Sequence, residues 1–484
     1  MPPLNPDAST SPSDKLRSDA LEIWQAGIEA VKPARLFESK LVWEPDAFCI
    51  DDVWVDLSKL KRIVVVGAGK ASGAMAAAFY QQLQQHFSQQ DKSAPPCVGW
   101  VNCPAETFDP NWDTGQIHLH TARPAGMNVP TPAAVEGTRQ ILDIVRSCTA
   151  EDLLLCLLSG GGSAVLVAPP PGLELADKQA VAQRVAAAGG NIDQLNLIRR
   201  CLSLVKGGGL AAQFHGQRLI TLAISDCLGD PIETIASGPT VAGSEREPRQ
   251  ALAALEDLQL LEDPALQRIV QYLQALVAEQ NASPPLDSPR QDSREYIVLG
   301  NNSDAVDAAG VKAVELGYRY VMQAARAVEG DVSQVACHAA QAATQVMQQE
   351  EVDCWISGGE PTVTLPQQPG KGGRNQQLTL AVLDGLVKAD WPNPALYPRP
   401  LVFLSGGTDG EDGPTDAAGA MFDAPLWQAA ERAGVRPEDY LSRADAYHYF
   451  ARVGGLIRTG ATGTNVCDLR VALAGPRPTN APDR

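Results

Sequence analysis

The chain has 484 residues, of which 44% are hydrophobic and 20% are charged, and its formal net charge is −18. This composition is ordinary for a globular protein, and the length predicts two or three domains. The acidic balance argues against general binding to nucleic acid or to an anionic membrane surface, and the sequence lacks the run of about 18 apolar residues that a membrane-spanning helix needs.

The N-terminus and the cysteines both favour a cytoplasmic protein. Residues 1–14 are polar and rich in proline, which predicts disorder and does not follow the basic and then apolar order of a secretion signal. Ten cysteines are scattered without a C-x-x-C pair. Reduced thiols are therefore favoured over disulfides or a structural zinc site.

Apolar periodicity predicts the elements in chain order. Residues 16–31 place apolar side chains at helical spacing, and residues 62–66 form a short β-branched run that is typical of a buried strand. A glycine-rich turn at 67–73 and an alanine-rich helix through residue 83 follow, which is the opening of an α/β unit. Further apolar runs that end in polar or glycine-rich turns occupy residues 153–158, 219–224, 296–299, 354–356 and 401–404.

Ser-Gly-Gly follows three of these runs, and the turn after residue 404 is the richest in acidic residues. Strand carboxyl ends in open α/β sheets converge on one crevice, so we expect the turns to form one ligand site. Glycine N–H groups attract phosphate oxygens, whereas carboxylates repel them unless a cation intervenes. The stretch 401–416 therefore predicts a magnesium–phosphate site, with an acidic surface turn as the alternative.

The main predicted boundary is the proline-rich stretch 282–294. It separates an N-terminal domain of residues 15–281 from a C-terminal domain of residues 295–477, which leaves residues 478–484 as a tail.

Two basic residues follow glycine-rich turns that open predicted helices. Lys70 would add its charge to a helix N-terminus and hold a phosphate or a carboxylate. Arg374 could bind a phosphoryl group or a carboxylate at two points. The plain alternatives are a solvated lysine and a helix-start arginine paired with a nearby carboxylate. The glycines around Lys70 match the dinucleotide fingerprint only in part, because no acidic residue ends a second strand, and the P-loop pattern is absent.

One further turn and two acidic residues each have two possible roles. The turn from Ser159 to Ser163 could be an anion-binding nest or hold a serine nucleophile, although the G-x-S-x-G pattern is missing. Asp226 ends a predicted strand and could bind Mg²⁺ or cap a turn. Glu360, which follows a Ser-Gly-Gly turn, has the same ambiguity.

Several motifs, spread in order from about residue 16 to residue 474, resemble the glycerate 2-kinase family of MOFRL type. They include VVGAGKASGAM, LLSGGGSAVLVAPPPGL, LVKGGGLA, GKGGRNQQLTLA, SGGTDGEDGPTDAAGA and TGATGTNVCDL. The resemblance implies two α/β domains with the active site in the cleft between them. The larger N-terminal domain would be Rossmann- or flavodoxin-like, and the smaller C-terminal MOFRL domain would be mixed α/β.

The resemblance also implies the reaction: ATP-dependent phosphorylation of D-glycerate to 2-phosphoglycerate, with Mg²⁺ or another divalent cation. An NAD(P)H-dependent hydroxypyruvate reductase and a non-catalytic binding protein are the alternatives, and a homodimer is compatible with the sequence. Cys467 departs from the asparagine that is usual in the family. The expected catalytic residues are Lys70 and Arg374, and the expected metal ligands come from Asp226, Asp409 and Asp412. The expected substrate and nucleotide contacts are Gly67, Gly69, Ser159, Gly160, Gly161, Gly162, Ser163, Asn301, Glu360, Asn375, Gly406, Gly407 and Thr408.

Overall fold

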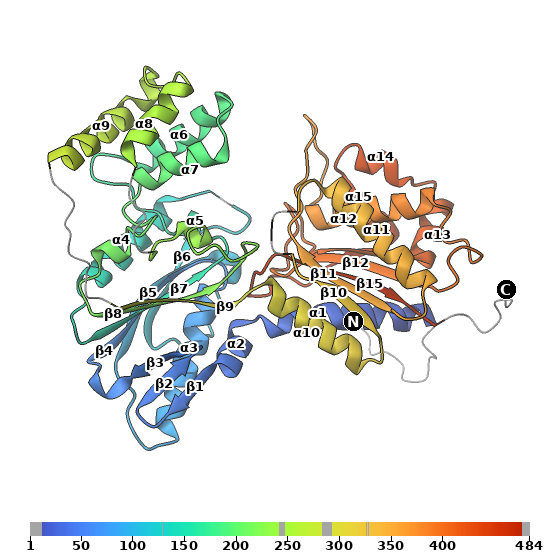
Figure 1. Cartoon of the computed structure of the whole chain (residues 1–484), viewed down its shortest axis with the longest axis horizontal. Helices are drawn as coiled ribbons and strands as arrows, with labels where there is room; N and C mark the ends of the chain where they lie inside the picture. Colours follow the sequence, from blue (N-terminus) through green and yellow to red (C-terminus); the bar gives the residue numbers. More distant parts are fainter. Residues whose placement is uncertain are drawn as a thin grey trace. The chain divides into compact units, whose positions relative to one another are not determined.

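The structure is a computed structural model that describes residues 12–476, apart from residues 128, 242–246, 283–292, 326 and 328. Contacts divide the chain into two compact units (Figure 1). The N-terminal unit comprises Leu36–Ile224 and Asp230–Leu299. The C-terminal unit comprises the described residues up to 35, Ser225–Gly229 and the described residues from 300 onward.

This division differs from the predicted domains. Helix α1 (Pro12–Ala30), which we expected in the N-terminal domain, belongs to the C-terminal unit, and the short segment Ser225–Gly229 joins the same unit. Residues 12–14, predicted to be disordered, form the first turn of α1. The remainder of the predicted disordered terminus, most of the predicted linker and the tail lie outside the described residues.

The N-terminal unit is built on a six-stranded sheet of order β6-β5-β4-β7-β8-β9. In chain order this is 3-2-1-4-5-6, the order of a doubly wound nucleotide-binding fold. The gap beyond the carboxyl ends of β4 and β7 is its switch point, because the chain leaves these two neighbours toward opposite edges of the sheet. The strands are β4 (Arg62–Ala68), β5 (Cys97–Pro104), β6 (Gln116–Arg123), β7 (Asp152–Ser159), β8 (Arg218–Ile224) and β9 (Ser293–Gly300).

Burial explains the strand sequences of this sheet. All eight residues of β7 are buried, and β7 pairs in parallel with β4 and β8, so a continuous apolar run is what the fold requires there. The other elements of the unit are α2 (Pro33–Lys40), β1 (Leu41–Glu44), β2 (Ala47–Ile50), β3 (Val53–Asp56), α3 (Ser72–Ser88), α4 (Pro132–Arg146), α5 (Gly162–Val165), α6 (Leu175–Ala187), α7 (Ile192–Cys201), α8 (Pro248–Asp257) and α9 (Gln267–Ala282). Helices α6 to α9 share an apolar core of their own, which includes Val181 and Leu255.

The C-terminal unit contains a mixed sheet of order β10-β11-β15-β12-β13-β14. Its last strand, β15, is antiparallel to both of its neighbours, so β11 and β12 end at the same edge of the sheet where β15 begins. The elements are β10 (Tyr320–Gln323), β11 (Cys354–Gly359), β12 (Leu401–Gly407), β13 (Gly419–Asp423), β14 (Leu456–Ile457), β15 (Asp468–Ala474), α10 (Asn302–Glu315), α11 (Val332–Gln348), α12 (Arg374–Lys388), α13 (Ala424–Arg432), α14 (Pro437–Leu441) and α15 (Ala446–Val453).

Two apolar cores lie on the two faces of this sheet. Alternate residues of β12 point to opposite faces, so Val402 joins a core with α1 and α10, while Phe403 joins a core with α11, α12 and α15. In Figure 1 the blue α1 lies beside the yellow α10. Trp24 of α1 is fully buried in the first core.

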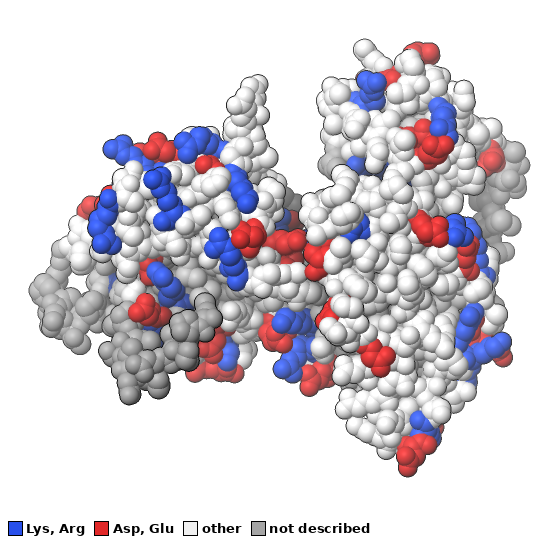
Figure 2. All heavy atoms as spheres, turned by 180° about the vertical axis from the view of Figure 1, so that it is seen from behind, with Lys and Arg blue, Asp and Glu red and all other residues white. Residues whose placement is uncertain are grey.

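The surface carries both signs of charge. Figure 2 shows acidic and basic side chains interspersed over the face that it presents. Among the described residues, the helices fall short of the length and apolar character that crossing a membrane demands. The ten cysteines are all free thiols, as the sequence predicted.

Candidate active site

The turn that carries Lys70 packs against the turn after β7, at the switch point of the N-terminal unit. The Lys70 N–H donates to the Gly160 carbonyl at 2.9 Å, and the Ala71 N–H donates to Ser159 Oγ at 2.9 Å. Gly69 has φ +142°, and a Cβ there would overlap Ser159. The structure therefore brings together two turns that are about 90 residues apart in sequence, as strand convergence predicts.

Only some residues of these two glycine-rich turns are exposed and can contact a ligand. Ser159 is fully buried and its hydroxyl also lies 3.2 Å from Ser72 Oγ, so it fastens the two turns and is not the ligand contact that we expected. Gly67 allows β4 to approach β7, because a Cβ there would lie 2.6 Å from the Leu157 carbonyl oxygen. Lys70, Gly161 and Ser163 retain exposed surface in the same turns.

In the C-terminal unit, the edge where β11 and β12 end and β15 begins holds a second group of expected residues. Asp468, the first residue of β15, is in register with Gly359 on one side and with Gly407 on the other. Arg374 begins α12 and donates from Nε and Nη2 to the two carboxylate oxygens of Asp468, at 2.8 and 2.9 Å. A third bond joins its Nη1 to Glu360 Oε1 at 2.6 Å.

Arg374 is thus a helix-start arginine paired with nearby carboxylates, as the alternative interpretation predicted. These bonds still leave part of its guanidinium for a ligand. Within the described residues, three of the five guanidinium N–H groups are used, so two remain available to an anion. The side chain of Arg374 is 33% exposed and that of Asp468 is 0% exposed. The two-point pair with a buried carboxylate fixes the plane of the guanidinium, and preorganised binding of a phosphoryl group needs such a fixed plane.

Burial and neighbouring charges change the pKa of Glu360. Burial raises the pKa of its carboxyl, the charges of Asp468 and Asp226 raise it further, and Arg374 opposes them. Cys467 Sγ donates to the Asp226 carbonyl at 2.8 Å, and Asn465 Nδ2 donates to Asp226 Oδ2 at 3.2 Å. Asp226 thus belongs with this group and retains partial exposure.

Cys467 adopts φ +69°, a left-handed conformation that asparagine tolerates better than cysteine. The asparagine that the family resemblance implies at this position would therefore suit the observed backbone conformation.

Much of the stretch 401–416 is structural, which corrects several expected ligand contacts. Asp412 is 2% exposed, and its oxygens accept the backbone N–H groups of Asn375 and Gln376 at 3.0 and 2.8 Å, so it caps α12. Burial raises the pKa of Asp412 to about 7, against the pull of these N–H groups. Thr408 is buried and binds the Cys467 carbonyl and the Val466 N–H through its hydroxyl.

Three more expected contacts are occupied within the fold. The side chain of Asn375 is buried between Ser405 Oγ and Asp412. Gly406 gives room to Trp24, since a Cβ there would lie 2.6 Å from its ring. Asn301 forms a capping box with Asp304 at the start of α10.

The expected metal ligands separate into different environments. Asp412 is enclosed, whereas Asp226 and Asp409 are partly exposed. Among the residues that the structure describes, no group of three or more side chains is arranged to hold a metal ion. Magnesium commonly binds through one or two carboxylates and the substrate phosphates, so the carboxylate of Asp226 fits such an ion without a complete protein cage.

The residue that sequence reasoning missed is Asp468. Its signal in the sequence is the TNVCDL motif, in which an acidic residue follows Cys467 and precedes the last apolar run. The position becomes informative only when β15 is placed between β11 and β12.

Two family models match the chain, and relatives of known name are similar to it over most of its length. Residues 19–274 match the family model described as a domain of unknown function, DUF4147, and residues 353–468 match the MOFRL family. The chain is 33% identical to glycerate kinase from Bos taurus, over 98% of this chain and 96% of that protein. It is also 36% identical to a protein from Agrobacterium vitis that carries a hydroxypyruvate reductase name, over 86% of this chain and 100% of that protein.

A solved structure extends the likeness to the fold. The crystal structure of a glycerate kinase from Thermotoga maritima superposes with a TM-score of 0.73 at 28% identity, covering 96% of this chain and 100% of that chain. The doubly wound sheet, the mixed second sheet and the near full-length identity lead to one conclusion: the chain belongs to the MOFRL-type family of glycerate kinases.

Proposed function

We propose that this protein is a glycerate 2-kinase, which transfers the γ-phosphoryl group of ATP to the 2-hydroxyl of D-glycerate. The observation that carries the proposal is Arg374, which is fixed by a two-point pair with the buried carboxylate of Asp468 and, among the described residues, keeps two N–H donors for an anion. Relatives of nearly full length that are named glycerate kinase supply the substrate.

Lys70 and Arg374 are the proposed catalytic cations, each in its own unit. Phosphoryl transfer depends on positioning and on neutralising charge more than on covalent chemistry. Lys70 would neutralise charge on the γ-phosphoryl group beside the paired glycine turns, and the two remaining N–H groups of Arg374 would stabilise charge on the same group or on the glycerate carboxylate.

A divalent cation completes the proposed charge balance. Asp226 is the best of the three expected ligands because it is partly exposed, whereas Asp412 is enclosed as a helix cap. When bound, such an ion supplies charge neutralisation to the ATP phosphates.

Glu360 is our candidate for the base that accepts the hydroxyl proton. Its side chain is 42% exposed, it contacts Arg374, and its raised pKa brings proton affinity closer to neutral pH.

The test is a coupled assay of ADP release with D-glycerate, followed by NMR of the product. We expect ADP release that depends on both substrates and 2-phosphoglycerate as the product. A protein that releases ADP without D-glycerate, or forms 3-phosphoglycerate, would contradict the proposal.

A hydroxypyruvate reductase is the second candidate, because one relative carries that name. The dinucleotide-binding fold needs an acidic residue at the end of its second strand to bind the ribose. Strand β5 ends Asn102-Cys103-Pro104, and the nearby Glu106 is paired with Arg123 at 2.9 Å. We therefore expect no oxidation of NADH or NADPH with hydroxypyruvate, which an absorbance assay measures.

A further inference from the structure

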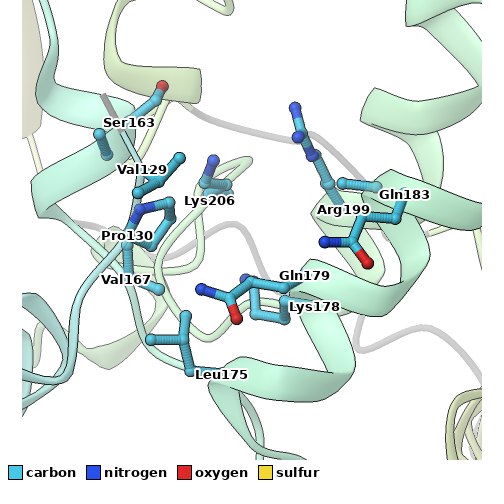
Figure 3. Close-up of a pocket in the computed structure, with 12 residues that line it drawn as sticks. Val129, Pro130, Ser163, Val167, Leu175, Lys178, Gln179, Gln183, Arg199 and Lys206 are labelled. Atoms are coloured by element: carbon cyan, nitrogen blue, oxygen red, sulfur yellow. The ribbon is translucent and has the colours of Figure 1, made fainter. Parts of the chain in front are cut away.

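A cavity of about 480 Å³ in the N-terminal unit gathers three basic side chains from three segments (Figure 3). Lys178 comes from α6, Arg199 from α7, and Lys206 from the turn that follows α7. Among the residues that the structure describes, those that line the cavity include no aspartate or glutamate. The volume lies within the range of small-molecule sites, so the cavity can hold a ligand of nucleotide size.

The three charges have no carboxylate to offset them within the described part of the chain. Lys178 Nζ donates to the Leu202 carbonyl at 2.8 Å, a neutral acceptor. Burial lowers the pKa of Lys178 to about 7 and that of Lys206 to about 8, and the neighbouring cations lower both further. Grouped cations of this kind, in a chain with a net charge of −18, favour a ligand that is itself an anion.

The cavity has a polar side and an aliphatic side. In Figure 3, Lys206 lies between Ser163 and Arg199, and the ends of these side chains surround an open space. Val167 and Leu175 form part of the opposite wall. A ligand that fills the cavity therefore combines several negative charges with an apolar portion.

Ser163 connects the cavity to the switch-point turns. It belongs to the same glycine-rich turn as Gly160, which accepts a hydrogen bond from the Lys70 N–H, and its hydroxyl lies 2.7 Å from Ser237 Oγ. The loop of Ser237 is in turn bonded to the turn of Lys206, because the Gly207 N–H donates to the Ser237 carbonyl at 2.9 Å. The cavity thus adjoins the turn that carries Lys70.

We propose that this cavity binds a nucleoside triphosphate, with its phosphates against Lys178, Arg199 and Lys206 and its base or ribose against the aliphatic wall. Glycerate has one negative charge and no apolar face, so it would leave two cations and the wall uncovered. The inference rests on the proposed function for the identity of the nucleotide as ATP.

Direct binding of an ATP analogue with a fluorescent N-methylanthraniloyl group tests the inference without requiring turnover. Arg199→Gln and Lys206→Met each remove one charge from the cavity and keep much of the side-chain volume. We expect each variant to bind the analogue about 10- to 100-fold more weakly, as loss of one charge-assisted contact implies. Arg200→Gln is the matched control, since Arg200 is the next residue of α7 and does not line the cavity. We expect it to bind like the wild type, and circular dichroism checks that each variant is folded.

A second measurement uses the wild-type chain alone. Lysines with a lowered pKa react with acylating reagents near neutral pH, so Lys178 and Lys206 are expected to be labelled early, as peptide mass mapping detects. ATP and inorganic tripolyphosphate should both protect these two lysines, whereas D-glycerate should not.

The outcomes separate this inference from the proposed function. Unchanged nucleotide affinity in both variants would overturn the inference, even if the wild type phosphorylates glycerate. A raised KM for glycerate with unchanged nucleotide affinity would also overturn it and assign the cavity to the sugar acid. A wild-type chain that binds the analogue through these residues but does not phosphorylate glycerate would support the cavity and refute the proposed function.

Discussion

Replacing Arg374 by lysine tests whether the geometry of the guanidinium matters beyond its charge. The native side chain makes two parallel bonds to Asp468 and a third to Glu360. A lysine keeps the positive charge, but its single ammonium group cannot reproduce a planar two-point contact.

The magnitude follows from the bonds that are lost. At least one of the two bonds to Asp468 disappears, and a hydrogen bond to a charged group is worth about 1.5–3 kcal/mol. The arginine side chain is 33% exposed, so solvent screens part of this energy, and we expect the free energy of unfolding to fall by about 1–2 kcal/mol. We expect kcat to fall by about 10²–10³-fold, as for loss of one preorganised donor, with a smaller change in the KM for ATP.

Arg319→Lys is the matched control in the same unit. Arg319 makes an equivalent two-point pair with Asp353, from Nε at 2.9 Å and from Nη2 at 3.0 Å, and has no proposed catalytic role. The assay is coupled ADP release with D-glycerate, together with chemical unfolding. Near wild-type kcat in Arg374→Lys, or an equal loss of kcat in Arg319→Lys, would refute the reasoning.

Substitutions at four further positions test other parts of the proposed site and fold. Lys70→Ala should keep its fold by circular dichroism and lose about 10²–10³-fold in kcat, and turnover near that of the wild type would remove the proposed role of Lys70. Glu360→Gln should abolish the acidic limb of the pH–rate profile, because the native carboxyl has a raised pKa and must lose its proton to act as a base; an unchanged limb would exclude it. Burial raises the pKa of folded Asp412 to about 7, so the folded state holds more protons than the unfolded chain between about pH 4 and pH 7, and stability due to this group falls as pH rises. Asp412→Asn should therefore gain stability relative to the wild type on going from pH 5 to pH 8 in chemical unfolding, and a constant difference would contradict this. Cys467→Asn should raise the free energy of unfolding by up to about 1 kcal/mol by relieving the left-handed backbone, whereas Cys467→Ser should not; equal effects would argue against strain.

The sequence predicted the features of the fold that are local. The apolar runs at 62–66, 153–158 and 219–224 are strands β4, β7 and β8, each extended by one or two residues at its ends. Lys70 and the turn of Ser159 also come together as predicted, because parallel neighbouring strands deliver their following turns to the same edge.

The other features of the fold and the site depend on contacts between segments that are distant in sequence. A local sequence pattern cannot predict such contacts. Antiparallel insertion of β15 between β11 and β12 creates the position of Asp468, and burial turns Asp412 and Thr408 from expected ligand groups into supports of the backbone. Their residue types suit a phosphate site as well as a cap, so composition could not separate the two roles.

The membership of α1 in the C-terminal unit has a consequence for dissecting the protein. Ile23 and Trp24 of α1 share an apolar core with Val306 of α10 and with Leu469 and Val471 of β15. Gly27 permits a close approach, because a Cβ there would lie 2.6 Å from Leu469. A fragment cut at the proline-rich stretch 282–294 would leave one product with an uncovered tryptophan and the other with an uncovered sheet face. Each fragment would then tend to self-associate. Mixing the two purified fragments should restore solubility, because α1 of the first fragment can pack again on the sheet of the second.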